Sequence, residues 1–371
     1  MTKKNPKVSI IVCAYKVSDF LPQCIESLIA QTLKDIEIIC INDASPDNCS
    51  DIIEKYALID KRIKNIKNPK NYGISRSRNI GIKESTAPFI MFCDGDDFYN
   101  QDMCEKLYKS ITEENTDIAM CGINIIYQTC ANMKRSDENY YMIKYSGKHL
   151  VSNRIISSID YSPVNKIYKK SIIDKYNITF PDGLHYEDAC FNMKYLSVCN
   201  SISFQNSKLY NYIRRPNSIM TQTWAKKGKD FSVDHIYIMI EYFYFLKHNK
   251  ILLQYNSLFW NLFSVYENSA INNSKGIKAK INSWKTAKKF MEKNIDSLQK
   301  VDEKLQKSIK KQNAPTFLIR SSFYKFCDFW IRVACPLYKL QCWSGASIEN
   351  LDVNIKDLER RIEKMRNSSF K

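Results

Sequence analysis

The chain has 371 residues and a mass of 43.5 kDa, which is enough for two domains or for one large domain with an appendage. Its net charge is +17 at pH 7, and most of the excess lies late in the chain, where residues 225–371 hold 27 Lys and Arg against 14 Asp and Glu. There is no zinc-finger spacing, no RNP-type aromatic signature and no apolar run of the roughly 18 to 20 residues that span a bilayer, so no nucleic-acid partner is expected and membrane contact is expected to be peripheral.

The first 127 residues alternate short apolar, β-branched runs with helical patterns. This alternation is typical of βαβ units and predicts a doubly wound α/β domain with a mainly parallel sheet. The predicted strands are 8–15, 36–43, 63–67, 89–94 and 117–127, and the predicted helices are 19–32, 49–60, 74–85 and 102–114.

Residues 128–224 are predicted to add a second part to this domain. Residues 128–148 are polar and lack a clear period, so a loop or hairpin is expected there. A helix is predicted to begin near Glu187, and strands are predicted at 201–205 and 208–213.

From about residue 231 the pattern becomes helical, with aromatic-rich and Lys-rich runs. Since this pattern differs from the alternation before it, the chain is predicted to divide near residue 224. A first domain is expected over residues 1–224, made of the parts 1–127 and 128–224, and a basic α-helical region over residues 225–371.

Two segments of the basic α-helical region suggest partners. Residues 316–343 carry a wide apolar, aromatic face bordered by cationic side chains, which fits an interfacial helix on an anionic membrane surface. Residues 348–366 place apolar side chains at alternating spacings of three and four, which predicts a short coiled coil and a homodimer contact. Packing of either segment within the chain itself is the alternative.

The 13 cysteines suggest a reducing compartment. Many lie inside apolar runs, as Cys13, Cys40, Cys93 and Cys121 do, and there is no CxxC pair and no signal peptide. They are therefore predicted to be small core residues of a cytoplasmic protein, peripheral on the inner face of the cytoplasmic membrane.

Three predicted strands end in polar side chains. Ligands of open α/β sheets bind beyond the carboxyl ends of the strands, so these positions are the first candidates for a site. The first strand ends at Tyr15, the second at Asp43 and the fourth at the acidic run 94–97 (DGDD), and these groups are expected to share one cleft. The turn after the first strand contains no glycine, which excludes a GxGxxG fingerprint and a P-loop.

The acidic run is predicted to bind a divalent cation. Like charges packed this closely repel one another unless they are hydrated or bound to a cation. Mg²⁺ and Mn²⁺ take oxygen ligands from one or two carboxylates together with phosphate, so a cation here would neutralise a diphosphate. A solvated acidic turn is the alternative.

An ordered series of motifs extends this interpretation. The segments are VSIIVCAYK at the first strand, IEIICINDASPD at the second, NYGISRSRNIGI before the fourth and FCDGDD at its end. In this order they resemble the family 2 glycosyltransferases, a group of inverting enzymes with a GT-A fold. Farther along, NKIYKKSII, HYEDACFNMK and YNYIRRPNSI resemble acceptor-side motifs of members that build bacterial capsule, lipopolysaccharide and exopolysaccharide. The resemblance covers about residues 7–220 and implies a Rossmann-like GT-A domain.

On the donor side, the resemblance implies that Tyr15 stacks on the base of a nucleotide and that Asp43 accepts a hydrogen bond from this base, which is expected to be uracil. Arg78 matches the arginine that reaches the nucleotide or its diphosphate. The alternatives are a packing tyrosine, an Asx turn and a solvated arginine on a helix face.

The acidic run and a later loop would then handle the diphosphate. By resemblance, Asp97 is the metal ligand, Asp96 contacts the ribose or the metal, and Asp94 supports either role. The loop that closes over the donor diphosphate in related enzymes would be formed by Arg214, Arg215 and Ser218.

On the acceptor side, Glu187 and Asp188 match a Glu-Asp pair at a helix start, and Asp188 is the predicted catalytic base. Inversion needs one base to activate the acceptor hydroxyl, so a single carboxylate suffices. The alternative is that both acids only favour the positive end of their helix. His185 departs from the small or apolar residues of many relatives and is a candidate for acceptor choice. Lys166 could add charge nearby, or it could be a surface lysine.

These expectations combine into one function. The chain is predicted to be a hexosyl- or N-acetylhexosaminyl-transferase that uses a nucleotide diphosphate sugar, expected to be a UDP-sugar, and Mg²⁺ or Mn²⁺. The acceptor is expected to be a cell-surface glycan or a lipid-linked oligosaccharide. The alternative is an inactive nucleotide-sugar-binding scaffold subunit at the membrane. A sugar nucleotidyltransferase is disfavoured because its Gly-rich N-terminal loop is absent.

Overall fold

The computed structural model describes residues 5–128, 133–135, 145–214, 230–294 and 297. All of them belong to a compact unit that ends at residue 309. The predicted division near residue 224 and the two predicted segments at 316–343 and 348–366 lie outside the described residues.

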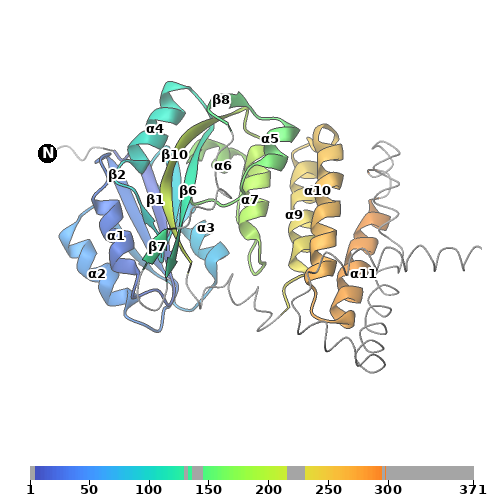
Figure 1. The fold of residues 1–371 in the computed structure, drawn as a ribbon, viewed down its shortest axis with the longest axis horizontal. Helices are drawn as coiled ribbons and strands as arrows, with labels where there is room; N and C mark the ends of the chain where they lie inside the picture. The colour runs from blue at the N-terminus through green and yellow to red at the C-terminus, as the bar shows by residue number, and fades with distance from the viewer. Residues whose placement is uncertain (1–4, 129–132, 136–144, 215–229, 295–296, 298–371) are drawn as a thin grey trace, which may run out of the picture. The chain divides into compact units, whose positions relative to one another are not determined.

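One ten-stranded sheet runs through the described residues, in the order β3-β2-β1-β4-β9-β6-β10-β5, with β7 paired to β6 and β8 paired to β10 (Figure 1). The strands are β1 (Val8–Ala14), β2 (Ile36–Asn42), β3 (Ile63–Lys67), β4 (Phe89–Asp94), β5 (Phe98–Tyr99), β6 (Ile118–Gln128), β7 (Met133–Arg135), β8 (Gly147–Leu150), β9 (Lys166–Lys169) and β10 (Ser201–Arg214).

The helices that follow these strands cover the sheet or continue beyond it. They are α1 (Leu21–Ile29), α2 (Cys49–Ile59), α3 (Ile74–Glu84), α4 (Met103–Glu113), α5 (Asn153–Ser158), α6 (Lys170–Tyr176), α7 (Glu187–Leu196), α9 (Asp234–His248), α10 (Leu252–Asn273) and α11 (Ile277–Lys293).

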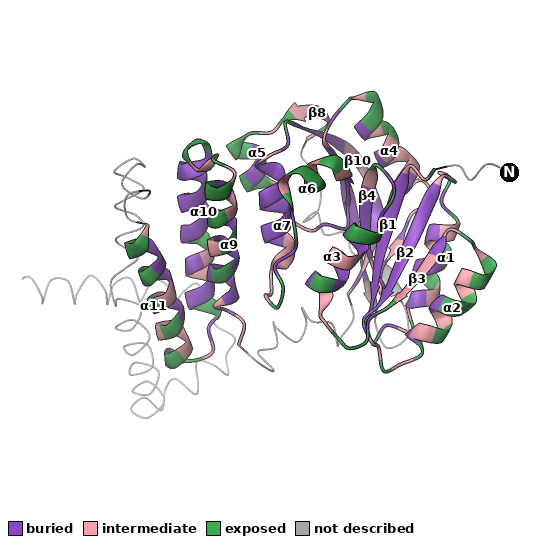
Figure 2. Cartoon of the chain, turned by 180° about the vertical axis from the view of Figure 1, so that it is seen from behind, coloured by how far each residue is buried: buried purple, intermediate pink, exposed green. Residues whose placement is uncertain are grey.

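The first half of the sheet is parallel, as predicted. β1 pairs with β2 and with β4, and β2 pairs with β3, all in parallel. β1 and β2 are buried along their whole length, and Figure 2 shows them in the buried colour. Apolar, β-branched runs without polar alternation form such strands because both of their faces are covered.

The second half of the sheet is mixed. β9 runs antiparallel to β4 and to β6, whereas β10 runs parallel to β6. The two strands predicted at 201–205 and 208–213 form the single strand β10, and a register shift lies between Gln205 and Lys208. The sequence pattern suggests two strands because polar residues interrupt the apolar run at this irregularity. The predicted hairpin is confirmed in part by the antiparallel pairing of β6 with β7.

The aromatic-rich helices after residue 231 extend the hydrophobic core of the sheet and its helices. The centre of the Phe243 ring lies 5.0 Å from that of Phe259 and 5.1 Å from that of Phe290. The ring centres of Trp260 and Phe263 are 5.4 Å apart. Figure 2 shows the buried residues along α9 and α10. Among the helices of the described residues, none is long and apolar enough to cross a membrane.

Gly81 sets the distance between α3 and β1. A Cβ atom at this position would lie 2.3 Å from Cγ2 of Ile11, far inside van der Waals contact. Arg78 lies on the same helix. The close packing of α3 on β1 therefore also fixes the distance between the Arg78 side chain and the sheet.

We therefore predict that Gly81→Ala lowers the free energy of unfolding by about 1–3 kcal/mol, because overpacking at Ile11 outweighs the roughly 1 kcal/mol by which Ala favours a helix over Gly. Urea unfolding measures this change. The matched control is the same substitution in an Ile11→Ala background, where only the Cβ of residue 11 remains, at 3.2 Å, and the loss should be much smaller. An equal loss in both backgrounds would show that the packing explanation is wrong.

Candidate functional site

The polar groups predicted at the strand ends meet at one edge of the sheet. In the parallel registers, Cys13 of β1 pairs with Asp94 of β4, and Ala14 pairs with Asn42 of β2. The next residue of the first strand end, Tyr15, is 40% exposed. Nζ of Lys16 lies 5.3 Å from the centre of its ring, and stacking of this ring on a nucleotide base stays a prediction.

Asp43 lies buried at the end of β2 and holds the loop before α3. Its carboxylate accepts hydrogen bonds from Nδ2 of Asn68 at 2.7 Å and from the backbone N–H groups of Tyr72 at 2.9 Å and Gly73 at 2.8 Å. The two backbone bonds join residues 29 and 30 positions apart, so they do not form the local Asx turn that was the alternative. A contact between Asp43 and a base stays a prediction.

The acidic run turns directly against β1. The N–H of Gly95 donates to the carbonyl of Cys13 at 3.2 Å, and a Cβ on Gly95 would lie 2.9 Å from the same carbonyl oxygen. Glycine is therefore needed at this position for the turn to pack so closely. The turn leaves the side chains of Asp94 and Asp96 partly exposed.

Asp97, by contrast, points into the protein. Its Oδ2 accepts a hydrogen bond from the hydroxyl of Tyr210 at 2.6 Å, and its Oδ1 accepts one from the N–H of Ile213 at 2.7 Å. Burial, with the neighbouring Asp96 and Asp94 carboxylates, raises the pKa of Asp97 well above its usual range. In this conformation the carboxylate fastens β10 to the acidic turn.

A divalent cation would find few protein ligands here. The described residues include no group of three or more His, Cys, Asp or Glu side chains placed to hold a metal ion. The partly exposed Asp96 and Asp94 fit a cation that takes one or two carboxylates and completes its coordination with phosphate oxygens and water.

Arg78 joins the acidic turn to the start of α7. Its Nη2 donates to Oδ1 of Asp94 at 2.9 Å, and its Nη1 donates to Oε1 of Glu187 at 2.8 Å. The residue is only 5% exposed, so the solvated-arginine alternative is wrong. Burial works to lower the pKa of Arg78, but the two carboxylates outweigh it and raise the pKa above its ordinary value. The guanidinium also lies 5.2 Å from the centre of the Phe180 ring.

Asp188 follows in the first turn of α7, and its helix begins at Glu187 as predicted. Its Oδ1 accepts from the N–H of Ala189 at 2.7 Å, and its carbonyl accepts from Nδ2 of Asn192 at 3.1 Å. Burial and the adjacent Glu187 carboxylate raise the pKa of Asp188 to about 7, against the opposing effect of Arg78. A carboxylate with a pKa in this range suits proton transfer near neutral pH.

Lys166 is fully buried in β9, so the surface-lysine alternative is wrong. Its Nζ donates to the carbonyl of Ser162 at 2.5 Å and to Oδ1 of Asn165 at 2.8 Å. Burial lowers the pKa of Lys166 to about 8. These bonds give Lys166 a part in shaping the loop before β9.

The remaining predicted residues are divided between the described and the undescribed parts of the chain. Arg214, at the end of β10, donates from Nη1 to the hydroxyl of Tyr127 at 2.7 Å. Arg215 and Ser218 lie outside the described residues. His185 lies in the loop before α7 and contacts Asp234 of α9, a residue that the sequence interpretation did not include.

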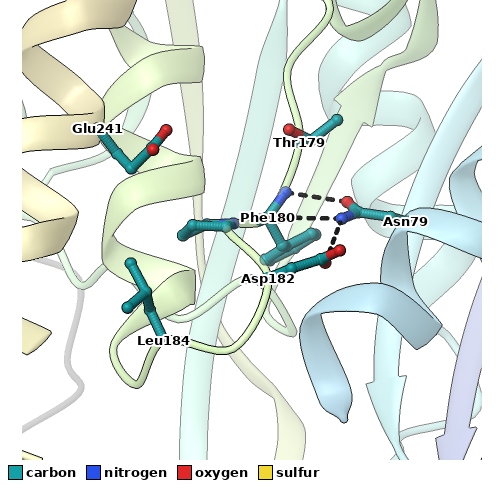
Figure 3. A pocket seen from close by; sticks show the side chains of 7 residues that line it. Asn79, Thr179, Phe180, Asp182, Leu184 and Glu241 are labelled. Atoms are coloured by element: carbon teal, nitrogen blue, oxygen red, sulfur yellow. Dashed lines mark hydrogen bonds between the residues drawn. The ribbon is translucent and has the colours of Figure 1, made fainter. Parts of the chain in front are cut away.

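A hollow of about 370 Å³ opens beside the loop before α7 (Figure 3). Asn79 of α3 forms part of its wall and is tied to the backbone of Phe180 by hydrogen bonds of 2.8 and 2.9 Å. Leu184 and Glu241 lie on the other side of the hollow. The loop from residue 179 to residue 184 therefore lies between α3 and α9 in space.

Comparison with known proteins agrees with the motif series. Residues 9–176 match the model of a family described as Glycosyl transferase family 2. Putative glycosyltransferase EpsH of Bacillus subtilis is 31% identical over 227 residues, which cover 60% of this chain and 65% of EpsH. Uncharacterized glycosyltransferase EpsJ of the same organism is 32% identical over 229 residues, which cover 58% of this chain and 63% of EpsJ. Both alignments span less than two thirds of the relative's own length.

Among solved structures, TarS 1–349 of S. aureus in complex with UDP-GlcNAc is similar in fold. The TM-score is 0.54 at 20% sequence identity, and the match covers 78% of this chain and 92% of that one. This likeness, together with the mostly parallel sheet and its helices, confirms the predicted GT-A fold.

We predict that Arg78→Met lowers the free energy of unfolding by about 3 kcal/mol, because the substitution leaves two partly buried carboxylates without their cation. Urea unfolding measures the loss. Arg76→Met is the matched control, since Arg76 lies two positions earlier on α3 and is exposed. If the two substitutions lower the free energy of unfolding equally, the buried ion pairs of Arg78 do not stabilise the fold as proposed.

Proposed function

Because this chain belongs to the family 2 glycosyltransferases, we propose that it transfers a sugar from a nucleotide diphosphate sugar to a hydroxyl group of a glycan or lipid-linked acceptor. The observation that supports this most directly is the bridge from Asp94 through Arg78 to Glu187. It brings the acidic turn, where a donor diphosphate would lie, next to the carboxylate pair that would face the acceptor.

The donor side would use the exposed groups at the strand ends. Tyr15 offers an exposed ring for a nucleotide base, and Asp43 lies at the neighbouring strand end. TarS, which has the same fold, was solved with UDP-GlcNAc, so we propose a UDP-sugar as donor and UDP-GlcNAc as the first one to test.

We propose Asp96, with Asp94 beside it, as the protein ligands of Mg²⁺ or Mn²⁺. Since both oxygens of Asp97 already accept hydrogen bonds, a role in positioning the turn is proposed for Asp97 in place of direct metal binding. A cation bound here supplies positive charge that stabilises the departing nucleotide diphosphate.

Asp188 would act as the single base of an inverting reaction. The acceptor oxygen forms a bond to the anomeric carbon on the face opposite the donor diphosphate, whose bond to that carbon breaks. The leaving diphosphate keeps the electron pair, and Asp188 takes the proton of the hydroxyl group. A single displacement of this kind inverts the anomeric centre, and it needs only one carboxylate.

The setting of the reaction is proposed from the chain's charge. The basic excess after residue 225 favours an anionic surface, so we propose a cytoplasmic enzyme, peripheral on the membrane, that acts on an acceptor of a cell-surface glycan. An inactive scaffold subunit would bind the donor but release no nucleotide diphosphate.

Donor binding is tested by thermal shift. UDP-GlcNAc with Mn²⁺ is expected to raise the melting temperature, because a ligand present at 100 times its Kd adds about 2.7 kcal/mol to stability. Asp96→Asn should remove the part of the shift that depends on Mn²⁺. Asp102→Asn, an exposed acid at the start of α4, is the control. If no nucleotide sugar in a panel of UDP and GDP donors shifts the wild type with metal, the donor site is wrong.

Asp188→Asn is expected to lower kcat by a factor of about 10² to 10⁴, the usual contribution of a general base, without weakening donor binding. The assay measures UDP released from UDP-GlcNAc in the presence of an alkyl glycoside acceptor. Asp174→Asn is a suitable control because Asp174 is exposed and pairs only with Lys170 among the described contacts. Wild-type turnover in Asp188→Asn would exclude Asp188 as the base.

The pH dependence of kcat/KM should also follow the ionisation of Asp188. A base works only when ionised, so kcat/KM is predicted to be constant above the raised pKa of about 7 and to fall about tenfold per pH unit below it. Glu187→Gln removes a charge that raises this pKa, so the midpoint should move to lower pH. The pH profiles of wild type and variant provide the measurement, and an unmoved midpoint would contradict the assignment.

A further inference from the structure

The loop that leads into α7 is held by the first turn of α9, a helix that lies beyond the residues matched by the family model. Asp234 is the first residue of α9 and is 8% exposed. Its Oδ2 accepts hydrogen bonds from the backbone N–H of His185 at 3.0 Å and from Nδ1 of the same residue at 3.2 Å. One carboxylate oxygen therefore fixes both the main chain and the ring of His185.

Aromatic rings join the same two segments. The ring of His185 stacks on Phe231, with centroids 3.5 Å apart and an interplanar angle of 23°. The ring of Tyr186 lies against His235, with centroids 3.7 Å apart. Consecutive residues of the loop thus each contact a ring from the segment that begins α9. The ring of His235 lies in turn 5.9 Å from Tyr266 of α10.

These contacts hold an unfavourable backbone turn. Tyr186 has φ 66° and ψ 27°, the left-handed region, which costs a residue other than glycine about 1–3 kcal/mol and persists only where the surroundings impose it. Tyr186 directly precedes Glu187, the first residue of α7. Its dihedral angles therefore set the direction in which Glu187 and Asp188 leave the loop.

α9 also packs along α7, the helix that carries Asp188. The thiol of Cys190 on α7 donates to the carbonyl of Ile238 on α9 at 3.5 Å, and the hydroxyl groups of Ser197 and Tyr242 lie 2.7 Å apart. Figure 3 shows that Glu241 of α9 and Leu184 of the same loop line one hollow. α9 thus contacts both the helix that carries the carboxylate pair and the loop before it.

We propose that Asp234 is a positioning residue for sugar transfer: by holding His185 it fixes the left-handed turn at Tyr186 and so orients Asp188 toward the acceptor. This inference rests on the proposed function. It makes α9 a part of the catalytic unit, although α9 lies 58 residues beyond the last residue that matches the family model.

The test compares wild type with Asp234→Ala and Asp234→Asn in the UDP-release assay. Asp234→Ala should lower kcat by about tenfold or more, since misplacing a catalytic group by about 1 Å can cost roughly 100-fold. The KM for UDP-GlcNAc should stay within about twofold, because the donor side is untouched. Asp234→Asn keeps an oxygen that can accept from His185, so it should recover most of the lost kcat. Glu292→Gln, an exposed charge change on α11, is the control.

A second readout does not depend on turnover. Hydrogen exchange at the amides of residues 186–190 should be faster in Asp234→Ala than in wild type and in Asp234→Asn. If Asp234→Ala fails to fold, Asp234→Ser takes its place, because serine suits the start of a helix but lacks the carboxylate oxygen that accepts from both groups of His185. The same loss of kcat at constant KM is then expected.

The outcomes separate this inference from the function on which it rests. A wild type that releases no UDP or GDP from any donor of the panel would overturn the proposed function. An active wild type with full kcat in Asp234→Ala would overturn the inference alone. A rise in donor KM equal to the fall in kcat would also overturn it, since that pattern indicates general damage to the site.

Discussion

The guanidinium group of Arg78 lies between the carboxylates of Asp94 and Glu187, and the arrangement of the site depends on this bridge. Removing charges from water is costly, and the cost is offset only where partners and geometry are good. Asp94 ends β4 and Glu187 begins α7, so one side chain of α3 holds three separate elements in register. The turn proposed for the donor and the pair proposed for the acceptor are therefore mechanically connected.

The close packing of the neighbouring elements makes the bridge possible. Gly81 lets α3 rest on β1, and Gly95 lets the acidic turn rest on the carbonyl of Cys13. Two glycines of the motif series thus act by letting neighbouring parts of the backbone pack closely. On the other side, α9 holds the loop before α7 through His185 and Tyr186. The start of α7 is consequently fixed from two directions.

The parallel half of the sheet could be predicted from the sequence, because strands buried on both faces leave apolar runs that end in polar residues. The surroundings of the side chains in the candidate site could not be predicted in this way. The motif series predicts a metal ligand at Asp97, but it gives no sign of the hydrogen-bond partners of this side chain, which lie 113 and 116 residues away on β10. A contact of Arg78 with the nucleotide or its diphosphate stays a prediction, and no local pattern indicates its partner Glu187, which is 109 residues away. Asp234 was missed because its contact with His185 spans 49 residues and follows no local pattern.

The most direct test of this account is a crystal structure of the protein with UDP-GlcNAc and Mn²⁺. We expect the base on the ring of Tyr15, the cation on Asp96 and the diphosphate above the acidic turn. We also expect Arg78 to bridge Asp94 and Glu187 as before, and Asp188 to face the anomeric carbon from the side opposite the diphosphate. A donor bound away from the ends of β1, β2 and β4, or an Asp188 turned away from the sugar, would contradict it.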